Sequence, residues 1–213
     1  MKVIDLTHTI ADDILVYPET EPVRLTPANT LEEDSFRETL LYMSSHTGTH
    51  MDAPAHMLEK APYLDDISVE SFCGRAYVLS CAGSGADNEI NADLLRNKPE
   101  LRDADYLILS TGWEKYWGTK EYFGDFPVLS EDAVEYLLKL GLKGIGTDTM
   151  SVDRMNSTDF PIHHQLMANH LVIIENLCNL TPIREKSVLF AALPLKFRRS
   201  DGAPVRAIAA ATL

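Results

Sequence analysis

The stretch from His46 to His56 constrains this chain more than any other segment. It reads HTGTHMDAPAH, and its three histidines and one aspartate all stand at even positions, so a straight strand would aim the four side chains to one face. A straight strand rises about 3.3 Å per residue, which would leave His46 and His50 roughly 13 Å apart. Ligands of one zinc-type ion lie only about 2.0–2.2 Å from it. The backbone must therefore bend, and Gly48 can adopt the unusual φ that a tight bend requires.

We therefore predict a bent strand end or loop that gathers His46, His50 and Asp52 on one metal ion. A helix would also bring positions four apart together, but a glycine, two threonines and a proline within the stretch disfavour it. The alternative is a polar loop whose histidines only satisfy backbone groups. Four ligand-type residues at this spacing favour the metal site.

His56 is expected to have a different role from the other three donors. It follows Pro54, which redirects the chain, so we expect His56 to stay off the metal. A free imidazole beside a metal can serve as a proton shuttle.

The HTGTHMDAPAH stretch resembles the signature HxGTHxDxPxH of the cyclase family of metal-dependent hydrolases, which includes bacterial kynurenine formamidases and isatin hydrolases. The match extends over all eleven positions. A strand that runs into TGW at 111–113, the glycine and aspartate pattern of residues 144–153, and Arg206 in PVRA are also similar to the family. The resemblance implies a swivelling β/β/α fold, referred to here as cyclase-like, and a homodimer.

Glu175 is the centre of the second half of the expected site. It ends the apolar run 172–174, and a buried carboxylate needs a cation, either an arginine or a metal ion. In the resembling family a histidine twelve residues before this glutamate completes a two-metal site, which implies His163 here. The neighbouring His164 is the alternative, and His170 is nearer in sequence but has no counterpart in the family.

The resemblance also implies which donor residues bind each of two metal ions. Asp52 and Glu175 would bridge two ions, with His46 and His50 on the first ion and His163 on the second. A donor set of imidazoles and carboxylates without thiolates suits zinc best, and manganese is the alternative because carboxylates are prominent. We therefore expect two Zn²⁺ ions per chain, or Mn²⁺ in their place.

These donors indicate the reaction. Two ions can hold a hydroxide between them and polarise a substrate carbonyl, and His56 would then pass the proton to the leaving nitrogen. We expect hydrolysis of a non-peptide carbon–nitrogen bond in a small-molecule amide, either an aryl formamide such as N-formylkynurenine or a cyclic amide. The alternatives are a cyclase- or dehydratase-type lyase at the same metal site and a non-catalytic metal-binding protein.

Residues outside the donor set carry further expectations. Tyr17 precedes Pro18 and must be extended; in the resembling formamidases an aromatic residue at this place, typically tryptophan, lines the substrate pocket. An ordinary loop aromatic that covers core is the alternative for Tyr17. Asp148 and Asp153 are candidates for orienting a metal-bound histidine, with turn hydrogen bonds as the alternative. His8, inside a strand expected over 3–10, is expected to be structural.

The order of elements predicts an α/β fold with a mixed, strand-rich core. Ser130 and Gly141 bound the clearest helix, Ser130–Leu140, and Asn91 can cap a short helix through Arg96. The aromatic loop 111–127 is expected to form a pocket wall or lid, although its tryptophans could be buried anchors or dimer contacts. The glycine-rich stretch 83–89 predicts a flexible connection. The expected strands are 3–10, 36–45, 75–82, 105–111, and a C-terminal pair that forms a hairpin across Asp201-Gly202.

Length and composition limit the class of protein. A chain of 213 residues suits one domain, 1–213. Its net charge of −13, without a basic patch, argues against nucleic acid and anionic membranes as partners. Three scattered cysteines without a CxxC pair predict no disulfide framework and a reducing cytoplasm. No signal peptide or membrane-spanning apolar run is found in the sequence.

Overall fold

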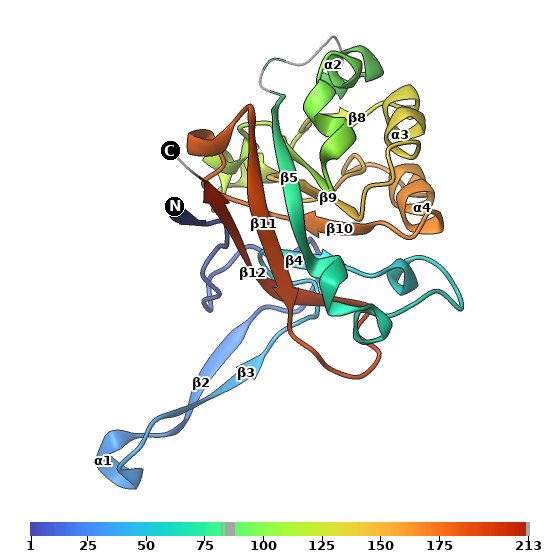
Figure 1. The fold of residues 1–213 in the computed structure, drawn as a ribbon. Helices are drawn as coiled ribbons and strands as arrows, with labels where there is room; N and C mark the ends of the chain where they lie inside the picture. The colour runs from blue at the N-terminus through green and yellow to red at the C-terminus, as the bar shows by residue number, and fades with distance from the viewer. Residues whose placement is uncertain (82, 84–87, 212–213) are drawn as a thin grey trace.

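The central sheet of the computed structural model, which describes residues 1–81, 83 and 88–211, closes on itself (Figure 1). Its eight strands follow the order β1-β12-β11-β5-β7-β9-β10-β4, and an added pairing of β12 with β4 closes the ring. The first residues of β12 pair with β4 and its last residues pair with β1. The strands are β1 Lys2–Asp5, β4 His50–Asp52, β5 Cys73–Ser80, β7 Tyr106–Ser110, β9 Gly144–Thr147, β10 Val172–Glu175, β11 Lys186–Pro194 and β12 Gly202–Ala211.

The strand directions are mixed, as predicted. Strands β5, β7, β9 and β10 are parallel to one another, whereas β1, β12, β11 and β4 join antiparallel neighbours. The parallel strands are buried on both faces because helices cover their outer side. These helices are α2 Ala92–Arg96, α3 Glu131–Leu137 and α4 Pro161–Ala168.

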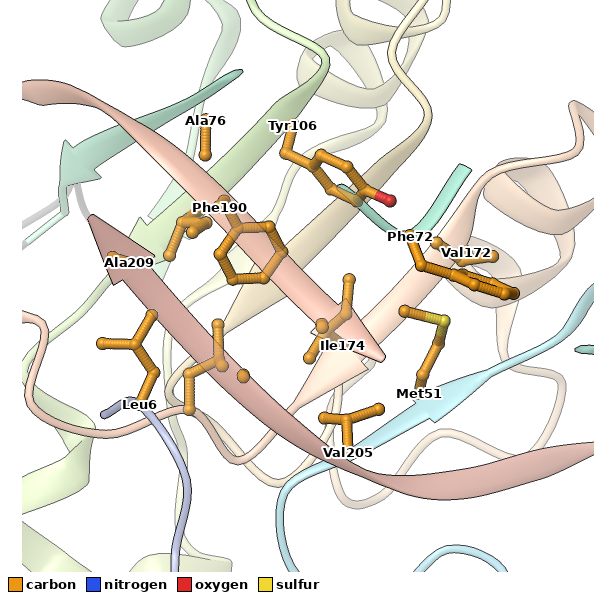
Figure 2. Packing of buried hydrophobic residues seen from close by; sticks show 14 of the residues in the cluster. Leu6, Met51, Phe72, Ala76, Tyr106, Val172, Ile174, Phe190, Val205 and Ala209 are labelled. Carbon is orange, nitrogen blue, oxygen red and sulfur yellow. The ribbon is translucent and has the colours of Figure 1, made fainter. Parts of the chain in front are cut away.

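Alternation along β7 divides the core into two clusters. Tyr106 and Ile108 point into the barrel, where Figure 2 shows Tyr106 close to Phe190, and their ring centroids lie 5.2 Å apart. Leu107 and Leu109 point outward and pack in a second cluster with α2, α3 and α4. The barrel is thus filled by side chains, so a substrate must bind at its end rather than inside it.

The predicted helices are present with small changes. Asn91 caps α2 by accepting a hydrogen bond from Leu94 N at 3.2 Å, as expected. Helix α3 begins after Ser130, but the Ser130 hydroxyl bonds to Ile90 O and not to the helix backbone. The helix was expected to run to Leu140 and end at Gly141, but α3 ends at Leu137 with Leu138 as its C-cap; Gly141, at φ +71°, lies at the end of the turn that follows.

Two predicted strands differ from the observed ones. The first strand, expected over 3–10, ends at Asp5 in β1, so His8 lies in the segment that follows it. The strand expected over 36–45 is only β3, Glu38–Tyr42, which pairs with β2, Arg24–Asn29. This hairpin, with α1 Leu31–Asp34 at its tip, projects away from the barrel (Figure 1). Strand β3 still ends four positions before His46 and so leads into the HTGTH segment, but from a hairpin outside the central sheet.

The C-terminal hairpin is correct in pairing but wrong in its turn. Strands β11 and β12 are antiparallel, yet residues 195–201 connect them, and Gly202 is already the first residue of β12. Asp201 is turned toward the donor histidines instead of forming a tight turn. Most of the flexible connection expected at 83–89 lies outside the described residues.

Short elements complete the description. A two-stranded parallel pair, β6 Glu89–Ile90 and β8 Val128–Leu129, lies on the helical side. The 3₁₀ turns are Pro54–His56, Leu64–Asp66, Val69–Phe72, Pro99–Asp103, Trp113–Tyr116, Lys120–Phe123 and Thr181–Ile183. Within the described ranges, no helix has the length and apolarity needed to cross a bilayer.

Candidate metal centre

The first donor trio comes from the bend that the sequence predicts. Gly48 adopts φ +63°, and the chain then enters β4 at His50. His46 Nδ1 lies 2.7 Å from Asp52 Oδ1, and His50 Nε2 lies 3.2 Å from the same oxygen. His46, His50 and Asp52 each offer one donor atom within 4.8 Å of the others. The three residues are therefore gathered closely enough to share one ion.

The second donor trio shares Asp52 with the first and adds His163 and Glu175. The register of β10 against β4 sets Glu175 opposite His50, so their side chains lie on one face. His163 stands in the first turn of α4. Its Nε2 is 3.4 Å from Glu175 Oε1 and 3.8 Å from Asp52 Oδ2. Two trios that share one carboxylate are the arrangement expected for a pair of ions.

The two carboxylates of the centre have opposite electrostatics. Burial raises the pKa of Asp52, but His50 and His46 outweigh it and hold that pKa well below its ordinary value. Burial and the negative charge of Asp52 both raise the pKa of Glu175. Glu175 is therefore the group that most needs a cation close by.

The donor histidines face strong negative charge. Burial lowers the pKa of His46, but Asp52 and Asp201 outweigh it and raise the pKa to about 10. Burial also lowers the pKa of His163, which Asp153 chiefly reverses, so that the pKa rises to about 10. Each histidine thus faces enough negative charge to attract a positive one.

The donor chemistry fits a divalent metal. Asp52 and Glu175 are 1% and 5% exposed, and two buried carboxylates near each other are unfavourable without a cation between them. Imidazole nitrogens and carboxylate oxygens suit zinc and manganese. Glu175 has no arginine partner among the ion pairs of the described chain, which favours the metal over the arginine that the sequence left open.

Asp153 supports His163 in two ways. Its Oδ2 lies 2.7 Å from His163 Nδ1, and its carboxylate also accepts from the backbone N–H groups of Ile162 and His163 at 3.0 and 2.9 Å. The same side chain therefore satisfies the start of α4 and turns Nε2 of His163 toward the centre. Asp148 instead accepts from Thr111 and Gly112. Of the two candidate orienting aspartates, only Asp153 contacts a donor histidine.

Asp201 is the site residue that sequence reasoning missed. Its Oδ2 lies 3.0 Å from His46 Nε2 and 3.9 Å from His56 Nδ1. A Cβ on the next residue, Gly202, would stand 2.3 Å from His46 Cε1. The Asp-Gly pair, interpreted from sequence as a turn, is therefore better explained as an acid that holds His46 and a gap that admits its ring.

His56 lies beside the donor residue His46, where a free imidazole next to the ion was expected from the sequence. Pro54 begins a 3₁₀ turn that ends at His56, and the His56 ring centroid is 4.1 Å from that of His46. His46, His56 and Asp201 form a third, half-buried group of possible ligands. Burial lowers the pKa of His56 to about 4, so the imidazole is neutral at physiological pH.

A pocket of about 360 Å³ opens over the donors. Its polar floor consists of the donor residues, and its walls are aromatic and thioether side chains, as in other small-molecule sites. Tyr17 lies in this wall, in agreement with its predicted position. The other lining residues are Thr20, Ser44, His46, His50, Asp52, His56, Met57, Met150, Ser151, Phe160, His163 and Glu175.

The remaining candidates lie elsewhere. His164 is half-buried on α4 and His170 is exposed beyond it, and neither belongs to a group of possible metal ligands in the described chain. Arg206 pairs with Asp5 at 2.7 Å on the surface. His8 stacks on Trp117 with ring centroids 3.8 Å apart. The aromatic loop packs against Met150 and lines no part of the pocket itself, so its expected role as a pocket wall is wrong for the isolated chain.

Fold and site together define a closed α/β barrel with a buried centre of two carboxylates and three histidines. The family model "Putative cyclase" matches residues 4–154. A kynurenine formamidase of Salinibacter ruber is 31% identical over 218 residues, covering 98% of this chain and 97% of the relative. A kynurenine formamidase of Geobacillus thermodenitrificans is 32% identical over 206 residues, covering 96% and 95%.

Solved structures agree with the sequence relatives. An isatin hydrolase bound to the product analogue thioisatinate superposes with a TM-score of 0.86 and 26% identity, covering 98% of this chain and 91% of that one. A potential metal-dependent hydrolase with cyclase activity gives a TM-score of 0.81 at 26% identity, with 98% and 96% covered. The chain belongs to the cyclase family.

Proposed function

We propose that this protein is a metal-dependent hydrolase that cleaves a non-peptide carbon–nitrogen bond of an aryl formamide or a cyclic amide. One observation carries the proposal: two donor trios share Asp52 at the floor of an aromatic pocket. The relatives named kynurenine formamidase and isatin hydrolase support amides of this kind as substrates.

In this proposal the donor residues divide between two ions. His46, His50 and Asp52 would hold one ion, and Asp52, His163 and Glu175 a second. Zinc, or manganese in its place, would supply an activated water and polarise the substrate carbonyl. Asp201 and Asp153 keep the outer nitrogens of His46 and His163 occupied, so that each ring keeps a fixed orientation.

His56 is the proposed proton shuttle. Its imidazole is neutral, lines the pocket, and lies beside His46. Cleavage of an amide needs a proton at the departing nitrogen, and a neutral imidazole can take that proton from the attacking water and hand it over.

The pocket walls favour a flat, aromatic substrate. Tyr17, Met57, Met150 and Phe160 surround the space above the donors, and aromatic and thioether groups bind the face of a ring well. A structural ion would be enclosed on all sides, whereas these donors open onto a pocket. This opening favours catalysis over a non-catalytic metal-binding role.

The first test joins metal content with turnover. Because the two donor trios can hold one ion each, protein purified without chelator is expected to carry about two ions per chain. It is also expected to release formate from N-formylkynurenine, or to open the ring of isatin, in a reaction that a chelator abolishes. Chromatography of the products separates hydrolysis from a lyase reaction. Folded protein that binds neither zinc nor manganese would refute the proposal.

His56→Gln tests the shuttle. The variant is expected to keep its metal while kcat falls about 10²- to 10⁴-fold, the usual share of general acid–base catalysis. His170→Gln, at an exposed histidine outside the site, is the control and should retain full turnover. Loss of one ion in His56→Gln would instead assign His56 as a ligand through the group it forms with His46 and Asp201.

A further inference from the structure

The three groups of possible metal ligands form a chain that leads from the surface into the interior. We call His46, His56 and Asp201 the outer group. It shares His46 with the first trio, and the first trio shares Asp52 with the second. All members of the outer group are half-buried, one member of the first trio is half-buried, and all members of the second trio are buried. An ion that moves inward from group to group can therefore keep one protein ligand at each step.

The buried donors are poorly placed to capture an ion directly from water. The side chains of His50, Asp52 and Glu175 are only 4%, 1% and 7% exposed. A hydrated divalent ion would have to lose most of its water before these donors could replace it, and removing an ion from water is costly. In the outer group the side chains of Asp201 and His56 are 41% and 29% exposed. An ion can therefore bind there while it still keeps water ligands.

Backbone contacts hold the outer group in place. Asp201 O accepts a hydrogen bond from Ala53 N at 2.8 Å, which fixes the acid beside the turn that carries His56. The Asp201 carboxylate lies 3.0 Å from His46 Nε2 and 3.9 Å from His56 Nδ1, and the two ring centroids are 4.1 Å apart. Two imidazoles and a carboxylate are ligands that zinc accepts. His46 and His56 line the pocket and Asp201 does not, so the outer group lies at the pocket edge.

His46 faces the outer group with one ring nitrogen and the first trio with the other. Its Nε2 lies 3.0 Å from Asp201, and its Nδ1 lies 2.7 Å from Asp52. An ion that moves from the outer group to the first trio can thus keep the same imidazole as a ligand. Once an inner ion holds His46, the outer group is left with two ligands, fewer than the three or four of protein zinc sites. The outer group should therefore stay empty in the loaded protein.

We propose that the outer group is an entry site for divalent metal, which captures a hydrated Zn²⁺ or Mn²⁺ ion and passes it through His46 to the first trio and through Asp52 to the second. The inference rests on the two-ion site of the proposed function. It gives Asp201 a task beyond holding His46, and it gives His56 a task beyond proton transfer.

An entry site and a positioning acid differ in their kinetics. A group that ions pass on the way in also lies on the way out, so its loss slows uptake and release alike and leaves the dissociation constant nearly unchanged. A positioning acid instead stabilises the bound state, so its loss speeds release and changes uptake little.

Rates of zinc uptake and release test the entry site. Uptake by chelator-stripped protein is followed with a chromogenic zinc indicator after rapid mixing, and release from zinc-loaded protein is extrapolated to zero chelator. Asp201→Asn is expected to slow both rates about 10- to 100-fold, within the range by which a negatively charged cleft speeds cation capture, while Kd changes less. His56→Gln should also slow both rates. The double variant should be no slower than the slower single variant, because both residues act in one group.

Asp65→Asn is the matched control. Asp65 carries the same charge beside the same segment, with Oδ1 3.3 Å from Ser200 N, but it belongs to no group of possible ligands in the described chain. Both of its rates should equal those of the wild type. Asp201→Glu keeps a carboxylate and should recover much of the uptake rate that Asp201→Asn loses. Circular dichroism confirms that each variant is folded.

Two results would overturn the entry site while leaving the proposed function intact. Faster release with unchanged uptake in Asp201→Asn would make Asp201 a positioning acid alone. Equal slowing in Asp65→Asn would assign ion capture to the overall charge of the chain, which is −13. A wild type that binds no zinc would refute both proposals, whereas zinc-loaded protein that hydrolyses no amide would refute the proposed function alone.

Discussion

The two halves of the candidate metal centre are built in different ways. The first trio comes from seven consecutive residues, 46–52, and depends on one backbone bend at Gly48. The second takes Asp52, His163 and Glu175 from three separate elements, β4, α4 and β10. A local trio can be damaged by a single change in backbone or ring position, whereas the distributed trio depends on strand register and on the start of a helix.

The halves also differ in the acids behind their histidines. Asp153, behind His163, is 2% exposed and also accepts two backbone N–H groups. Asp201, behind His46, has a side chain that is 41% exposed. Water and salt screen the exposed acid more, so the buried acid should matter more to its histidine.

Asp52→Asn should have the largest effect because both trios share this carboxylate. Neither ion is expected to bind tightly, and kcat/KM should fall on the order of 10³-fold, about 4 kcal/mol. Metal analysis and turnover measure both effects. The control is Asp93→Asn, whose side chain is 83% exposed on α2. Retention of two ions in Asp52→Asn would break the claim that the trios share a donor.

Asp153→Asn and Asp201→Asn compare the two halves directly. The first is expected to weaken metal binding at the second trio about 10- to 100-fold, and the second should cost less than about tenfold at the first trio because its carboxylate is screened. Calorimetric titration with zinc resolves the two. If Asp201→Asn lost more zinc affinity than Asp153→Asn, burial would not determine which acid matters more to its histidine.

Gly202→Ala disturbs the first trio by displacing the ring of His46. The new Cβ would meet three atoms of the His46 ring at 2.3 to 2.8 Å, so the ring must move and the free energy of unfolding should fall by about 1–3 kcal/mol. Gly118→Ala is the control for metal affinity only: its φ of +84° strains an alanine and lowers stability, but Gly118 belongs to neither trio, so both sites should bind metal as in the wild type. Equal loss of affinity at both trios would show that the halves are not independent.

Tyr17→Ala should have the smallest effect. Tyr17 is 39% exposed and lies in the pocket wall, so its loss is expected to raise KM about fivefold, roughly 1 kcal/mol, with metal content unchanged. A fall in kcat at constant KM would show instead that Tyr17 acts on the reacting bond.

Features formed by residues close together in sequence could be predicted from the sequence alone. His46, His50 and Asp52 were predicted as one group because ligand chemistry and a single glycine bend act over seven positions. The caps of α2 and the buried run of β7 were predicted for the same reason: hydrogen bonds and alternation are local. Such features depend on contacts between residues that are neighbours in the sequence.

Contacts between segments far apart in the sequence determine the remaining features of the site. The sequence predicts that Glu175 needs a cation, and the register of β10 on β4 places Glu175 opposite His50, beside the first trio. Asp153 and Asp148 look alike in sequence, but only Asp153 reaches a donor histidine. Asp201 was interpreted as part of a turn because nothing near it in sequence indicates His46, whose ring it meets through the pairing of β12 with β4. Such contacts arise from strand pairing and helix placement across the whole chain, which depend on the packing of the complete core.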